Sequence, residues 1–150
     1  MRLLIQRVNY ANVRIAEKLH ASIQKGLLVF VGIESADTPD DIVYLSGKLV
    51  NLRIFEDEEG KMNRSVKDIQ GELLIVSQFT LHASTRKGNR PSFITAAKPE
   101  QAESLYNSFV LATQNLMDTK IQTGVFGANM QIELLNSGPV TLLIDSKTKE

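Results

Sequence analysis

Gly-Leu-Leu-Val-Phe-Val-Gly-Ile, residues 26–33, is the stretch that decides the fold. Its unbroken apolar run after Gly26 is typical of a buried central strand. A second apolar run, LLIV, lies within residues 72–78 and predicts another buried strand. Two such strands need other elements to cover them, so the segments around them should carry apolar faces.

Two helices are predicted, one before and one after the second strand in the sequence. Thr38-Pro39-Asp40-Asp41 has a cap, a proline at the first helical position and acids near the positive end of the helix dipole. Lys98-Pro99-Glu100 starts the second helix. The residues expected to face the core are Ile42, Leu45 and Leu49 in the first helix, and Ala102, Leu105, Phe109, Ala112 and Leu116 in the second.

The remaining segments read mainly as strands. Residues 2–11 should form a strand that turns at Asn12 into a hairpin partner at 13–17. Residues 56–60 form a polar turn, and residues 121–145 read as strands broken at Gly124, Gly127 and Gly138. This order predicts an α+β fold with mixed β-sheets and two main helices, in a single domain spanning residues 1–150.

Composition narrows the chemistry. The chain has 43% hydrophobic and 23% charged residues, no cysteine and only two histidines. Disulfides, thiolate nucleophiles and thiolate metal sites are therefore excluded, and no HExxH pattern exists, so we expect no metal and no cofactor. No apolar run approaches the ~20 residues that span a bilayer, and the N-terminus is too polar for a signal peptide. We expect a soluble, cytoplasmic protein that does not bind membranes.

Charge is balanced overall but uneven locally. Residues 73–99 contain Arg86, Lys87, Arg90 and Lys98 and no acidic residue, so the rest of this net-neutral chain carries −4. A basic loop on a neutral protein indicates a local anionic ligand. The alternative is that these cations only keep a surface loop soluble.

Polar residues follow the second buried strand, in the segment SQFTLH at 77–82. If the strand continues, Gln78, Thr80 and His82 share one face and place an amide, a hydroxyl and an imidazole together. The alternative is a half-exposed strand with polar residues facing water. No G-x-S-x-G elbow, Walker A loop or Cys-x-x-Cys pair is present.

Three further segments are candidates for binding. In residues 86–93, three cations surround Gly88 and precede Phe93, an arrangement that can hold phosphates and stack a base, unless Phe93 packs in the core. GVFGANM at 124–130 allows close backbone approach or a tight turn. In NSGPVT at 136–141, Pro139 must mark an edge, bulge or turn, because proline cannot donate to a sheet ladder.

Together these segments resemble the D-aminoacyl-tRNA deacylases, over residues 2–145. The most specific pieces are SQFTL at 77–81 and NSGPVT at 136–141, supported by QRV at 6–8, KGNRPSF at 87–93 and GVFGANM at 124–130. The chain departs from the family pattern at Ser137, where an acidic residue precedes Gly-Pro, and at His82, where an aromatic residue is common.

The resemblance implies a homodimer with two active sites at its interface. It implies a cis Gly138-Pro139 peptide presented to the partner's site, where its carbonyls occupy the space that an L side chain needs. Arg7 would help to hold this loop. Chirality is then decided by exclusion, so glycine, which has no side chain, should be accepted as well.

The resemblance also assigns the site residues. Ser77, Gln78, Phe79 and Thr80 would be catalytic, with the N–H groups of Phe79 and Thr80 as candidates for an oxyanion hole. The residues implied to bind the 3′ end of aminoacylated tRNA are Lys87, Arg90, Phe93, Phe126, Gly127, Ala128 and Met130.

Two mechanisms remain open. Thr80 could be a covalent nucleophile, but a hydroxyl needs a nearby base, for which His82 is the candidate. The alternative, which we favour, is assistance by the terminal 2′-hydroxyl of the substrate. Two other functions compete with the deacylase: an RNA-binding module without catalysis, and a hydrolase of small D-amino-acid esters or amides.

Overall fold

The two apolar runs form neighbouring parallel strands in one mixed sheet. A computed structural model describes residues 1–149 and pairs β3 (Gly26–Gly32) in parallel with β6 (Glu72–Ser77). Leu27 and Leu73 belong to one core cluster, whereas Leu28 and Leu74 belong to a second cluster. Because successive side chains point to opposite faces of a strand, both faces are buried, and this explains why the runs are unbroken.

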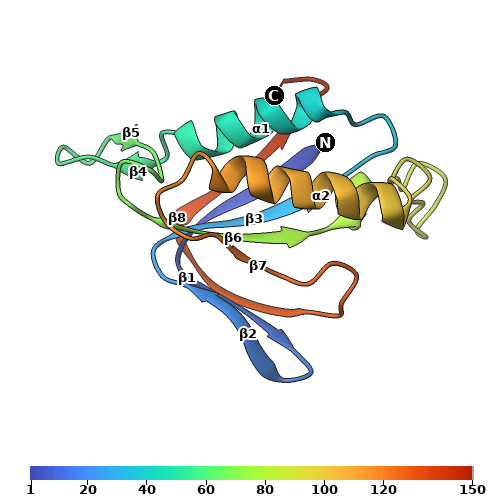
Figure 1. The fold of residues 1–150 in the computed structure, drawn as a ribbon, viewed down its shortest axis with the longest axis horizontal. Coiled ribbons are helices and arrows are strands. Elements are labelled where there is room, and N and C mark those ends of the chain that lie inside the picture. Colours follow the sequence, from blue (N-terminus) through green and yellow to red (C-terminus); the bar gives the residue numbers. More distant parts are fainter. Residues whose placement is uncertain (150) are drawn as a thin grey trace.

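A long first strand organises the rest of the sheet. The strand order is β2-β1-β3-β6-β7, and β8 (Gln131–Asp145) pairs with the other edge of β1 (Arg2–Ile15). β1 pairs with β3 through its first half and with β2 (Lys18–Ile23) through its second, while β7 (Gln122–Thr123) pairs in parallel with β6. Figure 1 shows β2 and the adjoining part of β1 bent away from the helices, where they cover the second core cluster.

Both predicted helices are confirmed and lie side by side on one face of the sheet (Figure 1). In α1 (Pro39–Asn51), the Asp41 carboxylate accepts the backbone N–H of Thr38 at 2.8 Å, and Ile42, Leu45 and Leu49 are buried as expected. In α2 (Pro99–Gln114) the stripe is only partly right. Ala102 and Phe109 are buried, but so are Tyr106 and Thr113, and Leu116 is exposed beyond the helix end.

The predicted first hairpin is wrong in its position. β1 runs through Asn12 to Ile15, and the turn lies at Ala16 and Glu17, with φ of 47° and 65°. A two-residue turn with positive φ at both positions matches the twist of the flanking strands. Alanine and glutamate are not the residues that such a turn favours, so the sequence carries no signal for it.

The smaller elements are close to expectation. The polar turn joins β4 (Phe55–Glu56) to β5 (Met62–Arg64) as a hairpin. The predicted strand break at Gly138 is wrong, because Gly138 lies inside β8 at a bulge. The α+β class with a mixed sheet and two helices is confirmed. Across residues 1–149, no helix is both long and apolar enough to cross a bilayer.

Candidate active site

The chain leaves the sheet directly after Ser77. The Gln78 N–H still donates to the Val31 carbonyl at 2.8 Å, but Phe79–His82 form a short 3₁₀ helix, η1. β3 ends at Gly32, so the ladder has no further partner, and the chain closes on itself through Leu81 N–H to the Gln78 carbonyl at 3.2 Å. The predicted strand continuation is therefore wrong.

This turn separates groups that the strand would have aligned. Thr80 is exposed, and its hydroxyl accepts a hydrogen bond from the Gln78 amide. His82 is 3% exposed and faces the core, where a Cβ on Gly32 would lie 3.1 Å from its Cδ2. His82 and Thr80 do not share a face, and the imidazole is poorly placed to act as a base for the hydroxyl.

The turn leaves two backbone donors free. Within residues 1–149, the backbone N–H groups of Gln78 and Leu81 donate hydrogen bonds. The N–H groups of Phe79 and Thr80, which lie between them, have no acceptor within that range. The first N–H groups of a helix have no intrahelical partner, which explains why these two remain available. They lie beside each other at the carboxyl end of β6.

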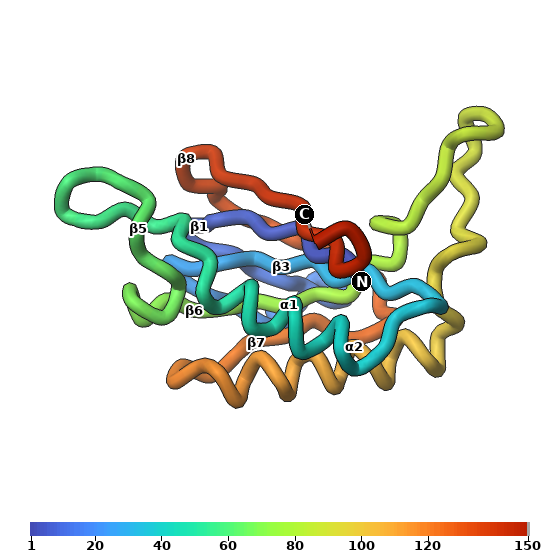
Figure 2. Tube along the Cα trace, turned by 90° about the horizontal axis from the view of Figure 1, so that it is seen from above, coloured from blue at the N-terminus to red at the C-terminus, as the bar shows by residue number. Residues whose placement is uncertain are grey.

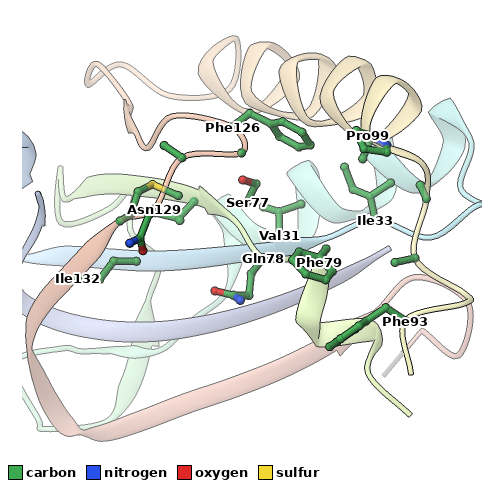
Figure 3. A pocket seen from close by; sticks show the side chains of 17 residues that line it. Val31, Ile33, Ser77, Gln78, Phe79, Phe93, Pro99, Phe126, Asn129 and Ile132 are labelled. Atoms are coloured by element: carbon green, nitrogen blue, oxygen red, sulfur yellow. The ribbon is translucent and has the colours of Figure 1, made fainter. Parts of the chain in front are cut away.

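A cavity of about 600 Å³ lies next to this turn. Figure 3 shows Ser77 between Phe126, which lies under α2, and Phe79 on the other side. The lining comes from the ends of β3 and β6, the start of α2 and the segment between β7 and β8. The lining residues are Val31, Ile33, Val76, Ser77, Gln78, Phe79, Phe93, Ala96, Ala97, Pro99, Ala102, Phe126, Gly127, Ala128, Asn129, Met130 and Ile132.

The cavity brings together most of the candidate residues. Ser77, Gln78 and Phe79 meet Phe93 and the 126–130 segment, although these segments are far apart in sequence. The parallel pairing of β6 with β7 causes this for the 126–130 segment, because the segments that follow the two strands leave the sheet at the same end. Asn129 lies within the GVFGANM motif that the sequence singled out, although it was not named as a site residue. Sequence reasoning missed Ile33 and Pro99, whose apolar character indicated only core or helix start.

An aromatic pair borders the cavity. The rings of Phe79 and Phe93 meet edge to face, with centroids 5.0 Å apart and planes at 68°. Phe79 is 57% exposed and Phe93 is half-buried, so Phe93 is a wall of the cavity rather than a core residue. Such a pair presents an apolar surface on which a flat ring can pack.

Next to this pair, residues 84–92 form a projecting loop, here called the basic arm. Ser84 and Ser92 close its base with two backbone hydrogen bonds of 2.8 and 2.9 Å. In Figure 2 this yellow-green segment rises away from the body of the molecule. Lys87 and Arg90 are exposed on it and do not line the cavity.

The Gly138-Pro139 peptide is cis and lies elsewhere in the chain. Between the pairs Gln6↔Thr141 and Val8↔Asn136, Arg7 of β1 faces residues 137–140 of β8 in a bulge. Arg7 is buried and donates to the Ser137 carbonyl at 3.1 Å and to the Ile54 carbonyl at 2.6 Å.

This bulge is remote from the cavity of its own chain. Arg7 pairs with Leu27, whereas Ser77 pairs with Val31. Four residues of strand place the two about 13 Å apart along the strand direction alone. Gly138 and Pro139 are exposed there. A single chain therefore does not bring Gly138 and Pro139 to the cavity.

The cavity has no strong electrostatic group of its own. Its 17 described lining residues include no Asp, Glu, His, Lys or Arg. Within residues 1–149, no cluster of three His, Cys, Asp or Glu side chains is placed to hold a metal ion. What the cavity offers is apolar walls, the Ser77 hydroxyl, two carboxamides, and backbone donors.

Comparisons with known proteins agree on one family. A family model described as "D-Tyr-tRNA(Tyr) deacylase" matches residues 4–145. A curated D-aminoacyl-tRNA deacylase of Cytophaga hutchinsonii is 60% identical over 147 residues, covering 98% of each chain. One of Flavobacterium psychrophilum is 58% identical over 150 residues, covering 100% of both.

Two solved structures have the same fold. One, titled "c-Myc DNA Unwinding Element Binding Protein", has a TM-score of 0.93 and 41% identity, and the match covers 97% of this chain and 98% of that one. The other, titled as a structural analysis of a probable eukaryotic D-amino acid tRNA deacylase, has a TM-score of 0.81 with 18% identity, covering 95% and 97%. At that identity the second likeness concerns the fold alone.

Proposed function

Because the chain belongs to the D-Tyr-tRNA(Tyr) deacylase family, we propose that its cavity binds the aminoacylated 3′ end of tRNA and releases a D-amino acid. The activity is that of a D-aminoacyl-tRNA deacylase, a hydrolase of the ester bond between amino acid and tRNA. The observation that carries the placement is the meeting of Ser77–Phe79 with the 126–130 segment in one cavity.

The apolar walls suit the terminal adenosine. Its base would pack against the wall formed by Phe126, Gly127, Ala128 and Met130, with Phe93 at the other border. Bases of single-stranded RNA stack on aromatic side chains without need of a charged partner. Lys87 and Arg90 on the basic arm would then contact phosphates of the nucleotides before the adenosine.

The chemistry takes place at the turn after β6. A water oxygen attacks the ester carbonyl carbon, and the carbonyl oxygen becomes an oxyanion. The N–H groups of Phe79 and Thr80 would donate to it, a contribution of several kcal/mol for preorganised donors. Collapse of this intermediate breaks the bond to the ribose oxygen, which takes one proton of the attacking water and leaves as a hydroxyl. The other proton passes to solvent, and the free amino acid departs as a carboxylate.

The cavity supplies no side-chain base for this attack. We therefore place the activating group on the substrate: the free 2′-hydroxyl of the terminal ribose orients the water, and the protein supplies geometry. The alternative, Thr80 as covalent nucleophile, lacks a neighbouring base, since His82 is buried away from it.

Selection of the D form would come from the partner subunit of a homodimer. Gly138 and Pro139 are exposed and lie away from the cavity of their own chain, so they are free to enter that of a partner. Arg7 holds the preceding Ser137 carbonyl and would fix the loop. Its carbonyls would occupy the position of an L side chain, and glycine would pass because it has none.

One assay tests this function. The protein, for which we propose a cytoplasmic location, is incubated with D-tyrosyl-, L-tyrosyl- and glycyl-tRNA, and released amino acid is measured. We expect release from the D and glycyl substrates and not from the L substrate. Hydrolysis of the L form at the rate of the D form would contradict selection by exclusion. Sedimentation should give a dimer; a fully active, D-selective monomer would rule out the cross-subunit arrangement.

The same assay, with a free D-tyrosine ester as a fourth substrate, separates the competing functions. A binding module, the role named for one structural relative, would bind nucleic acid through the basic arm and release no amino acid. A hydrolase of small esters would turn over free D-tyrosine esters as fast as D-tyrosyl-tRNA. Neither is favoured by a cavity that joins the turn after β6 to a wall suited to a nucleoside.

A further inference from the structure

One backbone carbonyl behind the cavity accepts two hydrogen bonds from different elements. The Ile75 carbonyl of β6 accepts the Tyr106 hydroxyl at 2.8 Å and the Gly124 N–H at 3.0 Å. A carbonyl oxygen has two lone pairs, so it can accept both bonds at once. Tyr106 comes from α2 and Gly124 follows β7, so three elements meet at this atom.

Each of these elements continues into a wall of the cavity. Two residues after Ile75, β6 reaches Ser77 and then the turn with the free N–H groups. Directly after Gly124, the chain enters the wall that contains Phe126. One turn before Tyr106, α2 contributes Ala102 to the lining. The distance between the turn and the opposite wall is therefore set near the Ile75 carbonyl.

The ring of Tyr106 contacts the same wall directly. Its centroid lies 6.0 Å from that of Phe126, with the planes tilted by 48°, a separation at which aromatic pairs attract. Tyr106 is 4% exposed and does not line the cavity, so it touches Phe126 from behind. Burial raises the pKa of Tyr106, so its hydroxyl stays a donor throughout the working pH range.

The junction is also packed closely on the side of Gly124. A Cβ added to Gly124 would lie 2.6 Å from the Met130 sulfur and 3.6 Å from Cγ1 of Val76. Met130 lines the cavity, so the glycine lets the end of the 124–130 segment close onto β6. A shift at this junction would therefore move Phe126 and Met130 together.

From these contacts we infer that Tyr106 is a positioning residue for the deacylation site. Through its hydroxyl it ties β6 to α2 at the point where β7 joins, and through its ring it holds Phe126. The identity of the bound nucleoside rests on the proposed function; the positioning of the 124–130 segment does not.

The test compares two full-length variants that each lose one buried hydroxyl from α2. Tyr106→Phe keeps the ring and removes the bond to Ile75. Thr113→Val is the matched control, because the Thr113 hydroxyl is fully buried but donates within the helix, to the Phe109 carbonyl at 2.7 Å. Three readouts are taken: hydrogen exchange of residues 77–80 and 124–130, binding of AMP, and kcat and KM for D-tyrosyl-tRNA.

For Tyr106→Phe we expect faster exchange in both segments, AMP binding weakened about three- to tenfold, and KM raised by a similar factor with kcat within about twofold. Thr113→Val should change none of these beyond its effect on global stability. If the two variants behave alike in exchange and in KM, Tyr106 is an ordinary core residue and the inference is overturned.

Two further outcomes are separable. If AMP does not bind the wild-type protein, the adenosine placement of the proposed function fails, and the exchange data alone decide the role of Tyr106. If Tyr106→Phe does not fold, Phe126→Leu replaces it, because this change removes the ring contact and keeps the hydroxyl bond. Without ligand it should speed exchange of residues 124–130 but not of residues 77–80; unchanged exchange of residues 124–130 would contradict the positioning of Phe126 by Tyr106.

Discussion

The hydroxyl of Thr80 lies at the centre of the mechanistic question. It is exposed and accepts a hydrogen bond from the Gln78 amide, and no ionisable side chain lines the adjoining cavity. We expect Thr80→Val to keep kcat/KM for D-tyrosyl-tRNA within about threefold of wild type, because a hydroxyl without a base is a weak nucleophile. Substrate ending in 2′-deoxyadenosine should lose about 100-fold or more. A large loss in Thr80→Val together with normal turnover of the 2′-deoxy substrate would assign the covalent role to Thr80.

Gly138 provides a residue-level test of chiral selection. Its φ is +124°, and an added Cβ would lie 2.9 Å from both Nη2 of Arg7 and Cγ2 of Val140. Gly138→Ala should displace the Gly-Pro carbonyls and lower the ratio of D- to L-tyrosyl-tRNA hydrolysis by about tenfold or more. The ratio is measured under single-turnover conditions.

Gly88 supplies the matched control for that change. Its φ is +123°, but nothing lies within 4 Å of an added Cβ. Gly88→Ala therefore introduces a similar backbone strain in the basic arm without touching β8. It should leave the ratio of D to L hydrolysis unchanged. An unchanged ratio in folded Gly138→Ala would remove the Gly-Pro loop from chiral selection.

At the scale of elements, the basic arm is joined to the body at Ser84 and Ser92 and carries exposed cations. Lys87→Ala and Arg90→Ala should each raise KM for D-tyrosyl-tRNA about three- to tenfold and leave kcat nearly unchanged. The dependence of log(kcat/KM) on log[salt] should become shallower by about 0.7 for each cation removed. Lys120→Ala, an exposed lysine outside the arm, is the control; equal effects from all three would indicate general charge only.

The turn between β1 and β2 allows a prediction on stability. Ala16 and Glu17 both have positive φ, which costs residues with a Cβ about 1–2 kcal/mol each. Replacing them by Asn and Gly, the pair that this turn favours, should stabilise the protein by about 1 kcal/mol after the entropy of glycine is counted. The melting temperature should rise by about 2–4 °C. A fall would mean that the turn differs from a two-residue hairpin turn.

At the scale of the whole molecule, residues 146 and 147 are hydrogen-bonded to the Asp41 carboxylate of α1. Asp41 accepts from Ser146 at 2.6 Å and from Lys147 at 2.8 Å. Burial opposes the ionised form, but hydrogen bonds from Lys147, Ser146 and Thr38 outweigh it and hold the pKa of Asp41 well below its usual value of 3.8. The same contact raises the pKa of Lys147 above 10.5.

The directions of these two pKa shifts define the pH range over which the contact between Asp41 and Lys147 stabilises the protein. A carboxyl with a lowered folded pKa stabilises the protein above its unfolded pKa, near 3.8, and this stabilisation is lost as pH falls below it. For Lys147 the stabilisation is present below 10.5 and is lost only as pH rises through the raised value. Asp41→Asn should therefore cost about 1–2 kcal/mol at pH 7. The difference from wild type should shrink below about pH 3.5.

Denaturant unfolding at pH 7 and at pH 3 measures this difference. Asp40→Asn, at the exposed neighbouring position in the first turn of α1, is the control and should change stability little at either pH. A cost for Asp41→Asn that stays constant across the acid range would mean that the interaction does not depend on the ionised carboxyl.

The sequence by itself determined the parts of this protein that depend on local chemistry. Unbroken apolar runs predicted β3 and β6, and the Thr38-Pro39 and Lys98-Pro99 pairs predicted the helix starts. The SQFTL and GVFGANM motifs named the turn after β6 and the 126–130 wall of the cavity. Caps, proline and apolar periodicity act over a few residues, so they can be read without the fold.

Only the tertiary structure decided what depends on distant segments. The end of β3 forced the turn at Phe79–His82, the covering of α2 buried Tyr106 and Thr113, and the pairing of β6 with β7 brought Ser77 to Phe126. It also placed Gly138-Pro139 away from the cavity of its own chain. Each of these results from packing between elements that are far apart in sequence, where the free energy of burial and pairing outweighs the local preference of the residues.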